Sequence, residues 1–245
     1  MIGVWDAGGT LAASVAELPL SVRPADGPEG SIVVVSGEGD WGAAAHAAVD
    51  AGAVAVVVVE PVSVGGADAP VSVPVVVVRS RVDGEVDLAA PSSAIVAECS
   101  ATDATADSAV RDTVGWAREL SGGHLRLRTR AAGSGGSLAL LETAAGVPVS
   151  LTVQLISGVP EGAVIRVTAL GAERRQVVVD DVAMLLEVTT AIDGATALRT
   201  GRFESPGRVA LRRALAALAS GDRPADLADL AHDVDLAHRI LDDSE

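Results

Sequence analysis

Short runs of apolar, mostly β-branched residues alternate with helical stretches along the first eighty residues. The runs predict strands, and the alanine-rich stretches between them predict helices. Strands are expected at Met1–Trp5, Leu20–Arg23, Ser31–Val35, Val54–Val59 and Val73–Val78, and helices at Thr10–Leu18 and Trp41–Ala51. Fully apolar strands that alternate with helices are typical of a parallel sheet covered on both faces. This part of the chain therefore predicts a small α/β domain.

The pattern changes after residue 88, where apolar and polar residues begin to alternate within each segment. A helix over Ser108–Leu120 comes before strands expected at His124–Arg130, Leu138–Thr143, Val149–Ile156, Val164–Leu170 and Gln176–Val179. Two helices, Pro206–Ala219 and Arg223–Leu241, follow them. Such alternation is typical of antiparallel strands. We therefore expect residues 1–88 to form a small parallel-sheet domain, and residues 89–245 an α+β domain with a mostly antiparallel sheet.

Composition and charge exclude several classes of function. The hydrophobic content of 49 % and charged content of 21 % suit a soluble globular protein. The net charge of −15 repels phosphate backbones and anionic lipids, so neither nucleic acid nor a membrane is an expected partner. The longest apolar run, Val54–Val59, is far shorter than the ~20 residues that span a bilayer. The N-terminus has no basic region typical of a secretory signal, and Cys99 is the single cysteine, so we expect a cytoplasmic protein without an internal disulfide.

One segment connects the pattern to a family. Residues Val54–Pro61 read VAVVVVEP, a buried strand that runs into Glu60-Pro61, and it follows Ser36-Gly37-Glu38 and an alanine-rich helix that ends at Ala51-Gly52. Further on, the chain reads DTVGWARELSG from Asp112 and LALLETAAGVPVSLTVQL from Leu138. In this order the segments resemble the Gfo/Idh/MocA family of NAD(P)-dependent oxidoreductases, and the resemblance covers most of the chain.

The resemblance implies a fold and a site. Residues 1–88 would be a reduced Rossmann-like domain, and residues 89–245 the family's C-terminal α+β domain. NAD or NADP would lie at the turn after the first strand. Candidate cofactor-binding residues are Gly8, Gly9, Ser36, Glu38, Glu60 and Pro61.

The departures from the family concern the residues that carry its chemistry. The family's Gly-x-Gly-x-x-Gly turn is represented only by Gly8 and Gly9, and the acidic residue that holds the ribose is missing after the second strand, where Arg23 is nearby. All 18 basic residues are arginine, so the lysine of the family's Glu-Lys-Pro cannot be present, and Glu60 stands where it would be. Ala109 occupies the position of the family's catalytic histidine.

Glu60 is the one candidate catalytic residue. Hydride transfer from a hydroxyl-bearing carbon needs a base, and a carboxylate serves as one at neutral pH only if burial raises its pKa. The competing interpretation is that Glu60 caps a strand end. A metal site is not expected, because His232 and His238 are six residues apart and do not share one helix face. His46 is expected to be a surface or half-buried residue of the alanine-rich helix, and His124 opens a strand and has no evident partner.

Three functional hypotheses remain. The first is a divergent, non-catalytic Gfo/Idh/MocA-like homologue that serves as a ligand-binding or partner subunit. The second is an atypical NAD(P)-dependent oxidoreductase that acts on a sugar or polyol. The third rests on the stretch from Trp41 to Pro61 and the following VPVVVVRS, which also resemble the N-terminal domain of Mur ligases and the protease-associated domain.

An assembly is expected as well. Leu138, Leu140, Val149, Leu151 and Val153 are predicted to share one face of the antiparallel sheet. An open apolar face requires cover, and members of the resembled family pair through this sheet. We therefore expect a homodimer through the second-domain sheet.

Overall fold

The chain folds into two compact units. The computed structural model describes residues 1–64, 72–82, 91–192, 195–199 and 204–242. The first unit comprises Met1–Ser80 together with Arg202–Ala231, and the second comprises Arg81–Gly201 together with His232–Glu245.

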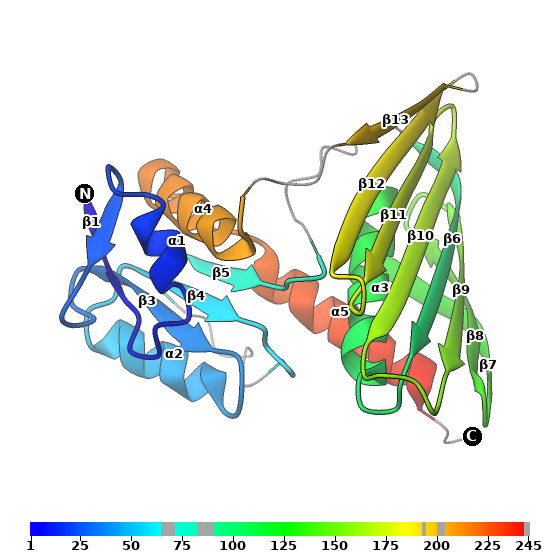
Figure 1. Cartoon of the computed structure of the whole chain (residues 1–245), viewed down its shortest axis with the longest axis horizontal. Coiled ribbons are helices and arrows are strands. Elements are labelled where there is room, and N and C mark those ends of the chain that lie inside the picture. The colour runs from blue at the N-terminus through cyan, green and yellow to red at the C-terminus, as the bar shows by residue number, and fades with distance from the viewer. Residues whose placement is uncertain (65–71, 83–90, 193–194, 200–203, 243–245) are drawn as a thin grey trace. The chain divides into compact units, whose positions relative to one another are not determined.

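The first unit is built on a five-stranded parallel sheet (Figure 1). Its strands lie in the order β2-β1-β3-β4-β5, and all four neighbouring pairs are parallel. The strands are β1 (Ile2–Trp5), β2 (Val22–Pro24), β3 (Ser31–Ser36), β4 (Ala55–Val59) and β5 (Val75–Val78). Valine is the main residue of β3–β5, as expected for strands buried on both faces.

Three helices cover this sheet. Helices α1 (Ala12–Ala16) and α4 (Pro206–Ser220) lie on one face, and α2 (Trp41–Asp50) lies on the other (Figure 1). Helix α4 shares an apolar core with β4 and β5, to which it contributes the buried Leu211. The Asp40 side chain caps α2 by accepting a hydrogen bond from the Ala43 amide at 3.0 Å.

The second unit contains an eight-stranded sheet in the order β13-β12-β11-β10-β6-β9-β8-β7. Every neighbouring pair is antiparallel except β6 and β9, which are parallel. The strands are β6 (Ser92–Ala101), β7 (Leu125–Gly133), β8 (Gly136–Thr143), β9 (Pro148–Leu155), β10 (Ala163–Gly171), β11 (Arg174–Asp180), β12 (Leu185–Ile192) and β13 (Ala195–Arg199).

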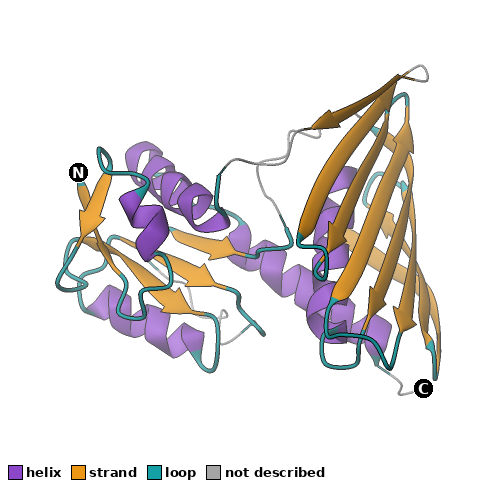
Figure 2. Cartoon of the chain, viewed as in Figure 1, coloured by secondary structure: helices purple, strands orange, loops and turns teal. Residues whose placement is uncertain are grey.

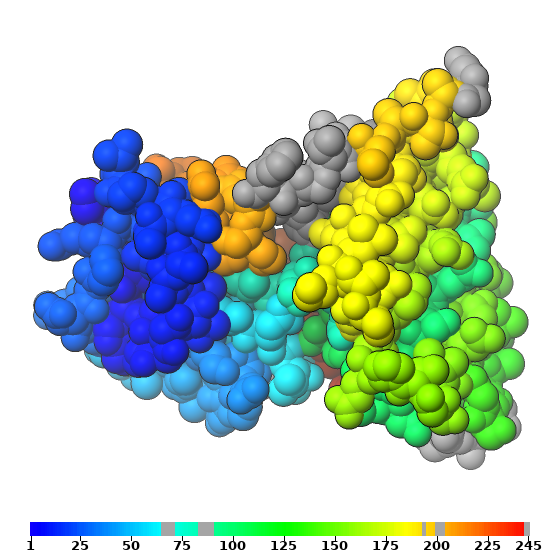
Figure 3. Space-filling model, in the orientation of Figure 1, coloured from blue at the N-terminus to red at the C-terminus, as the bar shows by residue number. Residues whose placement is uncertain are grey.

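Helices cover one face of the second sheet. Helix α3 (Ala106–Ser121) and the C-terminal part of α5 (Asp226–Leu241) pack on it, as Figure 2 shows. Trp116 and Leu120 of α3 and Ile240 of α5 are fully buried in the resulting core. In Figure 3 the side chains of β10–β12 lie at the surface of this unit with no helix in front of them.

The prediction that five apolar residues share one face of the second sheet is wrong. Val149, Leu151 and Val153 are buried beneath the helices, whereas Leu138 and Leu140 are 53 % and 44 % exposed on the other face. The five residues therefore do not share a face. The cause is the register: Leu138 lies opposite Thr152 and Leu140 opposite Ser150, and side chains alternate between faces along a strand.

The predicted fold class is confirmed, with a small parallel-sheet unit and a mostly antiparallel one. The chain does not divide as predicted, however, because Arg202–Ala231, with α4, belongs to the first unit rather than the second. The predicted boundary between residues 88 and 89 lies outside the described residues. No helix in the described part of the chain is long and apolar enough to cross a membrane.

Candidate functional site

The carboxyl ends of the parallel strands form the edge where a ligand is expected. Strands β1 and β3 are neighbours although β2 comes between them in the chain, so the strand order reverses there. Open α/β sheets bind ligands at the carboxyl ends of the strands beside such a reversal. The structure brings all predicted site residues to this edge: Gly8 and Gly9 after β1, Ser36 and Glu38 at the end of β3, and Glu60 and Pro61 after β4.

The turn after β1 is closed by its own carboxylate. Asp6 Oδ2 accepts a hydrogen bond from the Leu11 amide at 2.6 Å, and the Asp6 carbonyl accepts one from the Gly9 amide at 3.2 Å. Gly9 has a φ of 69°, in the left-handed region that glycine adopts without strain. The geometry of the turn therefore explains the glycine at position 9, and the Asp6 carboxylate occupies the Leu11 amide.

These residues do not fit a dinucleotide. A pyrophosphate is bound by free amides at the start of a helix and by glycines that allow close approach. Here the Leu11 amide is already taken by Asp6, whose negative charge also repels phosphate. Helix α1 has only five residues, and β2 ends at Pro24 without the acidic residue expected to hold a ribose.

The loop after β3 packs on the segment after β4. The Ser36 hydroxyl accepts a hydrogen bond from the Glu38 amide at 3.3 Å, and the Gly37 amide donates to the Val59 carbonyl at 2.7 Å. A Cβ atom on Gly37 would lie 2.3 Å from the nitrogen and Cα of Pro61. These contacts give Ser36 and Pro61 local roles in joining two strand ends.

Glu60 also joins strand ends. Its φ is 52°, its amide donates to the Val78 carbonyl at 2.9 Å, and its Oε1 accepts from the Ser80 amide at 2.5 Å. The residue is exposed, so the burial on which its use as a base depended is not found. The geometry favours the interpretation of Glu60 as a cap that connects β4 to the chain after β5.

Sequence reasoning missed Asp6 as a member of this site. The available signal was its place directly after a buried strand and before Gly8-Gly9-Thr10, since aspartate readily accepts hydrogen bonds from amides a few residues ahead.

A separate polar cluster lies within the second unit, at the start of α3. Asp112 is 1 % exposed and accepts hydrogen bonds from Arg111 Nε at 3.0 Å and Arg81 Nη1 at 3.3 Å. The Arg81 guanidinium also binds Asp181, with Nη2 2.7 Å from Oδ2, and donates to the Ser108 hydroxyl at 3.0 Å. Ala109, at the position of the family's histidine, is fully buried beside this cluster.

The arginine and aspartate side chains of this cluster form ion pairs with one another. Burial acts to raise the pKa of Asp181, but the hydrogen bonds and charge of Arg81 outweigh it and hold the pKa below its ordinary value. The pKa of Arg81 is raised above its ordinary value, chiefly by its hydrogen bond to Asp181. Such groups keep their charges near neutral pH and are suited to cross-linking segments rather than to proton transfer.

Three of the four histidines have structural partners. His46 Nδ1 lies 2.8 Å from the Gly42 carbonyl within α2. His124 and His232 stack with ring centroids 4.2 Å apart, and His232 Nε2 accepts a hydrogen bond from the Leu125 amide at 3.0 Å. Within the described residues, no group of three His, Cys, Asp or Glu side chains is placed to hold a metal ion.

Comparisons with known proteins rest on the fold. No protein-family model matches the sequence, and no curated protein matches it significantly. Among solved structures, UDP-N-acetylglucosamine 3-dehydrogenase GnnA from Acidithiobacillus ferrooxidans is 16 % identical, with a TM-score of 0.62 over 98 % of this chain and 88 % of that one.

A second similar structure is a lysine-to-glutamate mutant of KijD10, a 3-ketoreductase from Actinomadura kijaniata, in complex with TDP-benzene and NADP. It is 16 % identical, with a TM-score of 0.60 over 98 % of this chain and 96 % of that one. Both likenesses extend over the two units, well beyond the stretch that resembles Mur ligases and protease-associated domains. The resemblance to the Gfo/Idh/MocA oxidoreductases is thereby confirmed at the level of the fold.

Proposed function

We propose that this chain is a non-catalytic homologue of the Gfo/Idh/MocA oxidoreductases that acts as a ligand-binding or partner subunit. The proposal combines the shared two-domain fold with the residues found at the carboxyl edge of the parallel sheet.

The observation that carries the proposal is the hydrogen bond between Asp6 and the Leu11 amide. It places a carboxylate where a dinucleotide-binding protein presents free amides to a pyrophosphate. The exposed Glu60, which is hydrogen bonded to the Ser80 amide, supports the same conclusion because it replaces a lysine suited to proton transfer.

The alternative is an atypical NAD(P)-dependent oxidoreductase that acts on a sugar. The observation that favours it as the second candidate is the fold, because the similar structures are a UDP-N-acetylglucosamine 3-dehydrogenase and a 3-ketoreductase bound to NADP. In this alternative Glu60 would accept the hydroxyl proton.

The assay that separates the two measures nicotinamide reduction or oxidation at 340 nm, with NAD or NADP and nucleotide-activated sugars as substrates. The loss of each catalytic group of this kind typically costs ~10²–10⁴-fold in rate. We expect no turnover above the background without protein. Turnover that Glu60→Gln abolishes, and that Glu29→Gln at an exposed residue before the start of β3 leaves intact, would support the alternative instead.

We also propose a homodimer formed through the second sheet. Its helix-free face carries the exposed Leu138 and Leu140 of β8, Val96 of β6 and Leu170 of β10. Pairing with a second copy would remove these side chains from water. The predicted contribution of Val149, Leu151 and Val153 is withdrawn, because these residues are buried beneath helices.

A further inference from the structure

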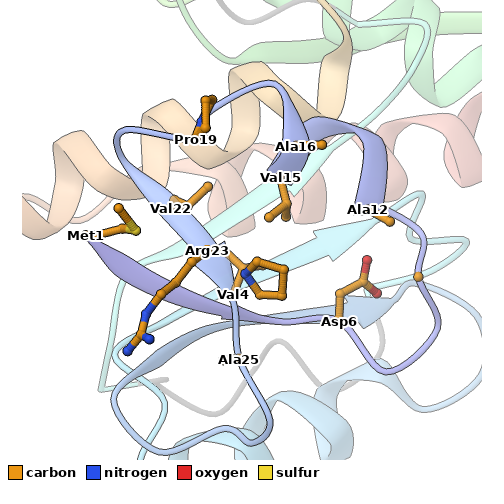
Figure 4. A pocket seen from close by; sticks show the side chains of 12 residues that line it. Met1, Val4, Asp6, Ala12, Val15, Ala16, Pro19, Val22, Arg23 and Ala25 are labelled. Atoms are coloured by element: carbon orange, nitrogen blue, oxygen red, sulfur yellow. The ribbon is translucent and has the colours of Figure 1, made fainter.

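A pocket of about 450 Å³ lies beside α1, within the first unit. Strand β1, helix α1 and strand β2 with its flanking residues contribute its walls. Its volume falls within the range typical of small-molecule sites. Figure 4 shows Val15 and Val22 in the middle of the pocket, Met1 and Arg23 on one side, and Asp6 and Ala12 on the opposite side.

The floor of the pocket is apolar. Val4, Val15 and Val22 line it and are almost completely buried from water. Ala12 and Ala16 of α1 add small side chains to the wall, and Pro19 adds another apolar surface. Helix α1 is only five residues long and presents alanines here, so the space is left open.

The charges at the pocket are separated. Arg23 lines one side and is exposed, and its guanidinium makes no hydrogen bond or ion pair with another residue in the described part of the chain. Asp6 lines the opposite side, with Oδ2 bound to the Leu11 amide. An anionic group would be attracted to Arg23 and repelled by Asp6, so the charges set the direction in which a ligand would lie.

We propose that this pocket binds a small organic anion, whose apolar body rests on Val4, Val15 and Val22 and whose anionic head pairs with Arg23. The inference deepens the proposed ligand-binding role by naming the class of ligand. It does not require a dinucleotide, because the floor is made of valine side chains and the nearby Leu11 amide is already bonded.

Three probes separate the parts of this recognition by isothermal titration calorimetry of the full chain. Octanoate has an apolar body and an anionic head, 1-octanol has only the apolar body, and inorganic phosphate has only the anion. We expect saturable binding of octanoate, weaker binding of 1-octanol and none of phosphate. Arg23→Gln should weaken octanoate about tenfold and leave 1-octanol unchanged, as expected for loss of one charge-assisted contact.

Two alanines of α1 provide a matched pair for the apolar wall. Ala16 lines the pocket, whereas Ala13 is exposed on the same helix and does not. Ala16→Phe should fill the space and abolish binding of octanoate and 1-octanol, while Ala13→Phe should preserve both. Arg23→Gln changes an exposed side chain, so the test remains decisive even if Ala16→Phe fails to fold.

Absence of saturable octanoate binding would overturn the proposal, as would equal octanoate affinities of the wild type and Arg23→Gln. Octanoate binding that Ala13→Phe and Ala16→Phe impair equally would place the site elsewhere and also overturn it. Calorimetry tests the anion-binding pocket and the assay at 340 nm tests the non-catalytic role. Either proposal can therefore be refuted while the other stands.

Discussion

Gly37 and Pro61 are in direct backbone contact, with so little space between them that a Cβ on Gly37 would lie 2.3 Å from the Cα of Pro61. The contact joins the loop after β3 to the segment after β4, two of the three places where the family resemblance located cofactor-binding residues. Glycine is required here by the close approach of the backbone of Glu60 and Pro61.

Replacement of Gly37 by alanine should therefore destabilise the protein. The clash is with backbone, which cannot move as a flexible side chain does, and overpacking typically costs about 1–3 kcal/mol. Urea unfolding of Gly37→Ala should show this loss. Gly27→Ala is the control, because an added Cβ at Gly27 meets nothing within 4 Å. Equal stabilities of the two variants would contradict the packing described for the carboxyl edge.

Removal of a carboxylate from the buried cluster at the start of α3 should lower the free energy of unfolding far more than removal of one from a surface ion pair. Asp112→Ala removes the buried carboxylate that accepts hydrogen bonds from Arg111 Nε and Arg81 Nη1. Breaking a buried ion pair in this way typically lowers the free energy of unfolding by about 3–5 kcal/mol. Glu142→Ala removes a carboxylate shared by the exposed Arg126 and Arg128, and should cost no more than about 1 kcal/mol. Urea unfolding of both variants tests the contrast, and similar losses would refute it.

The lowered pKa of Asp181 predicts that the free energy of unfolding depends on pH in the acid range. Its folded pKa is below the ordinary value, so the unfolded chain binds the proton more readily. The stabilisation is complete above the unfolded pKa of about 3.9 and is lost as the pH falls through that value toward the folded pKa. Asp181→Asn should make the free energy of unfolding less dependent on pH below about 5.

Ser108→Ala is the control for this dependence. It removes a hydrogen-bond acceptor of Arg81 but leaves the titrating carboxyl group in place, so the slope should persist. A wild-type slope in Asp181→Asn would show that other groups determine the acid sensitivity.

The proposed dimer predicts a specific response to charge. Leu140→Glu places a carboxylate on the helix-free face of the second sheet and should produce monomers, because burial of an unpaired charge is unfavourable. Leu20→Glu, at a residue that is 91 % exposed in the first unit, should leave the assembly unchanged. Light scattering at micromolar concentrations measures both. A monomeric wild type would contradict the dimer.

The sequence predicted all five strands of the first sheet, where the valines of β3–β5 mark their strands plainly. In the second sheet β12 and β13 were not predicted, and neither was β6, although it lies in the middle of the sheet. The inward residues of β6 include Ala97, Cys99 and Ala101, which are too small to produce a clear alternation.

Other features depend on contacts that a sequence pattern does not contain. The apolar stripe of α4 predicts a buried helix, but not that the helix packs on β4 and β5 rather than on the second sheet. The exposed state of Glu60 and the hydrogen bond from Leu11 to Asp6 depend on turn geometry. The edge of the site was thus predictable from strand ends, whereas its chemistry was not.

The central claim is that the carboxyl edge of the first sheet does not accept a dinucleotide, and titration with NADH and NADPH tests it most directly. Trp5 and Trp41 lie at the end of β1 and the start of α2, beside this edge, so their fluorescence reports on binding there. We predict no saturable change in fluorescence with either cofactor up to millimolar concentration. Saturable micromolar binding of NADH or NADPH to the wild type would contradict the account.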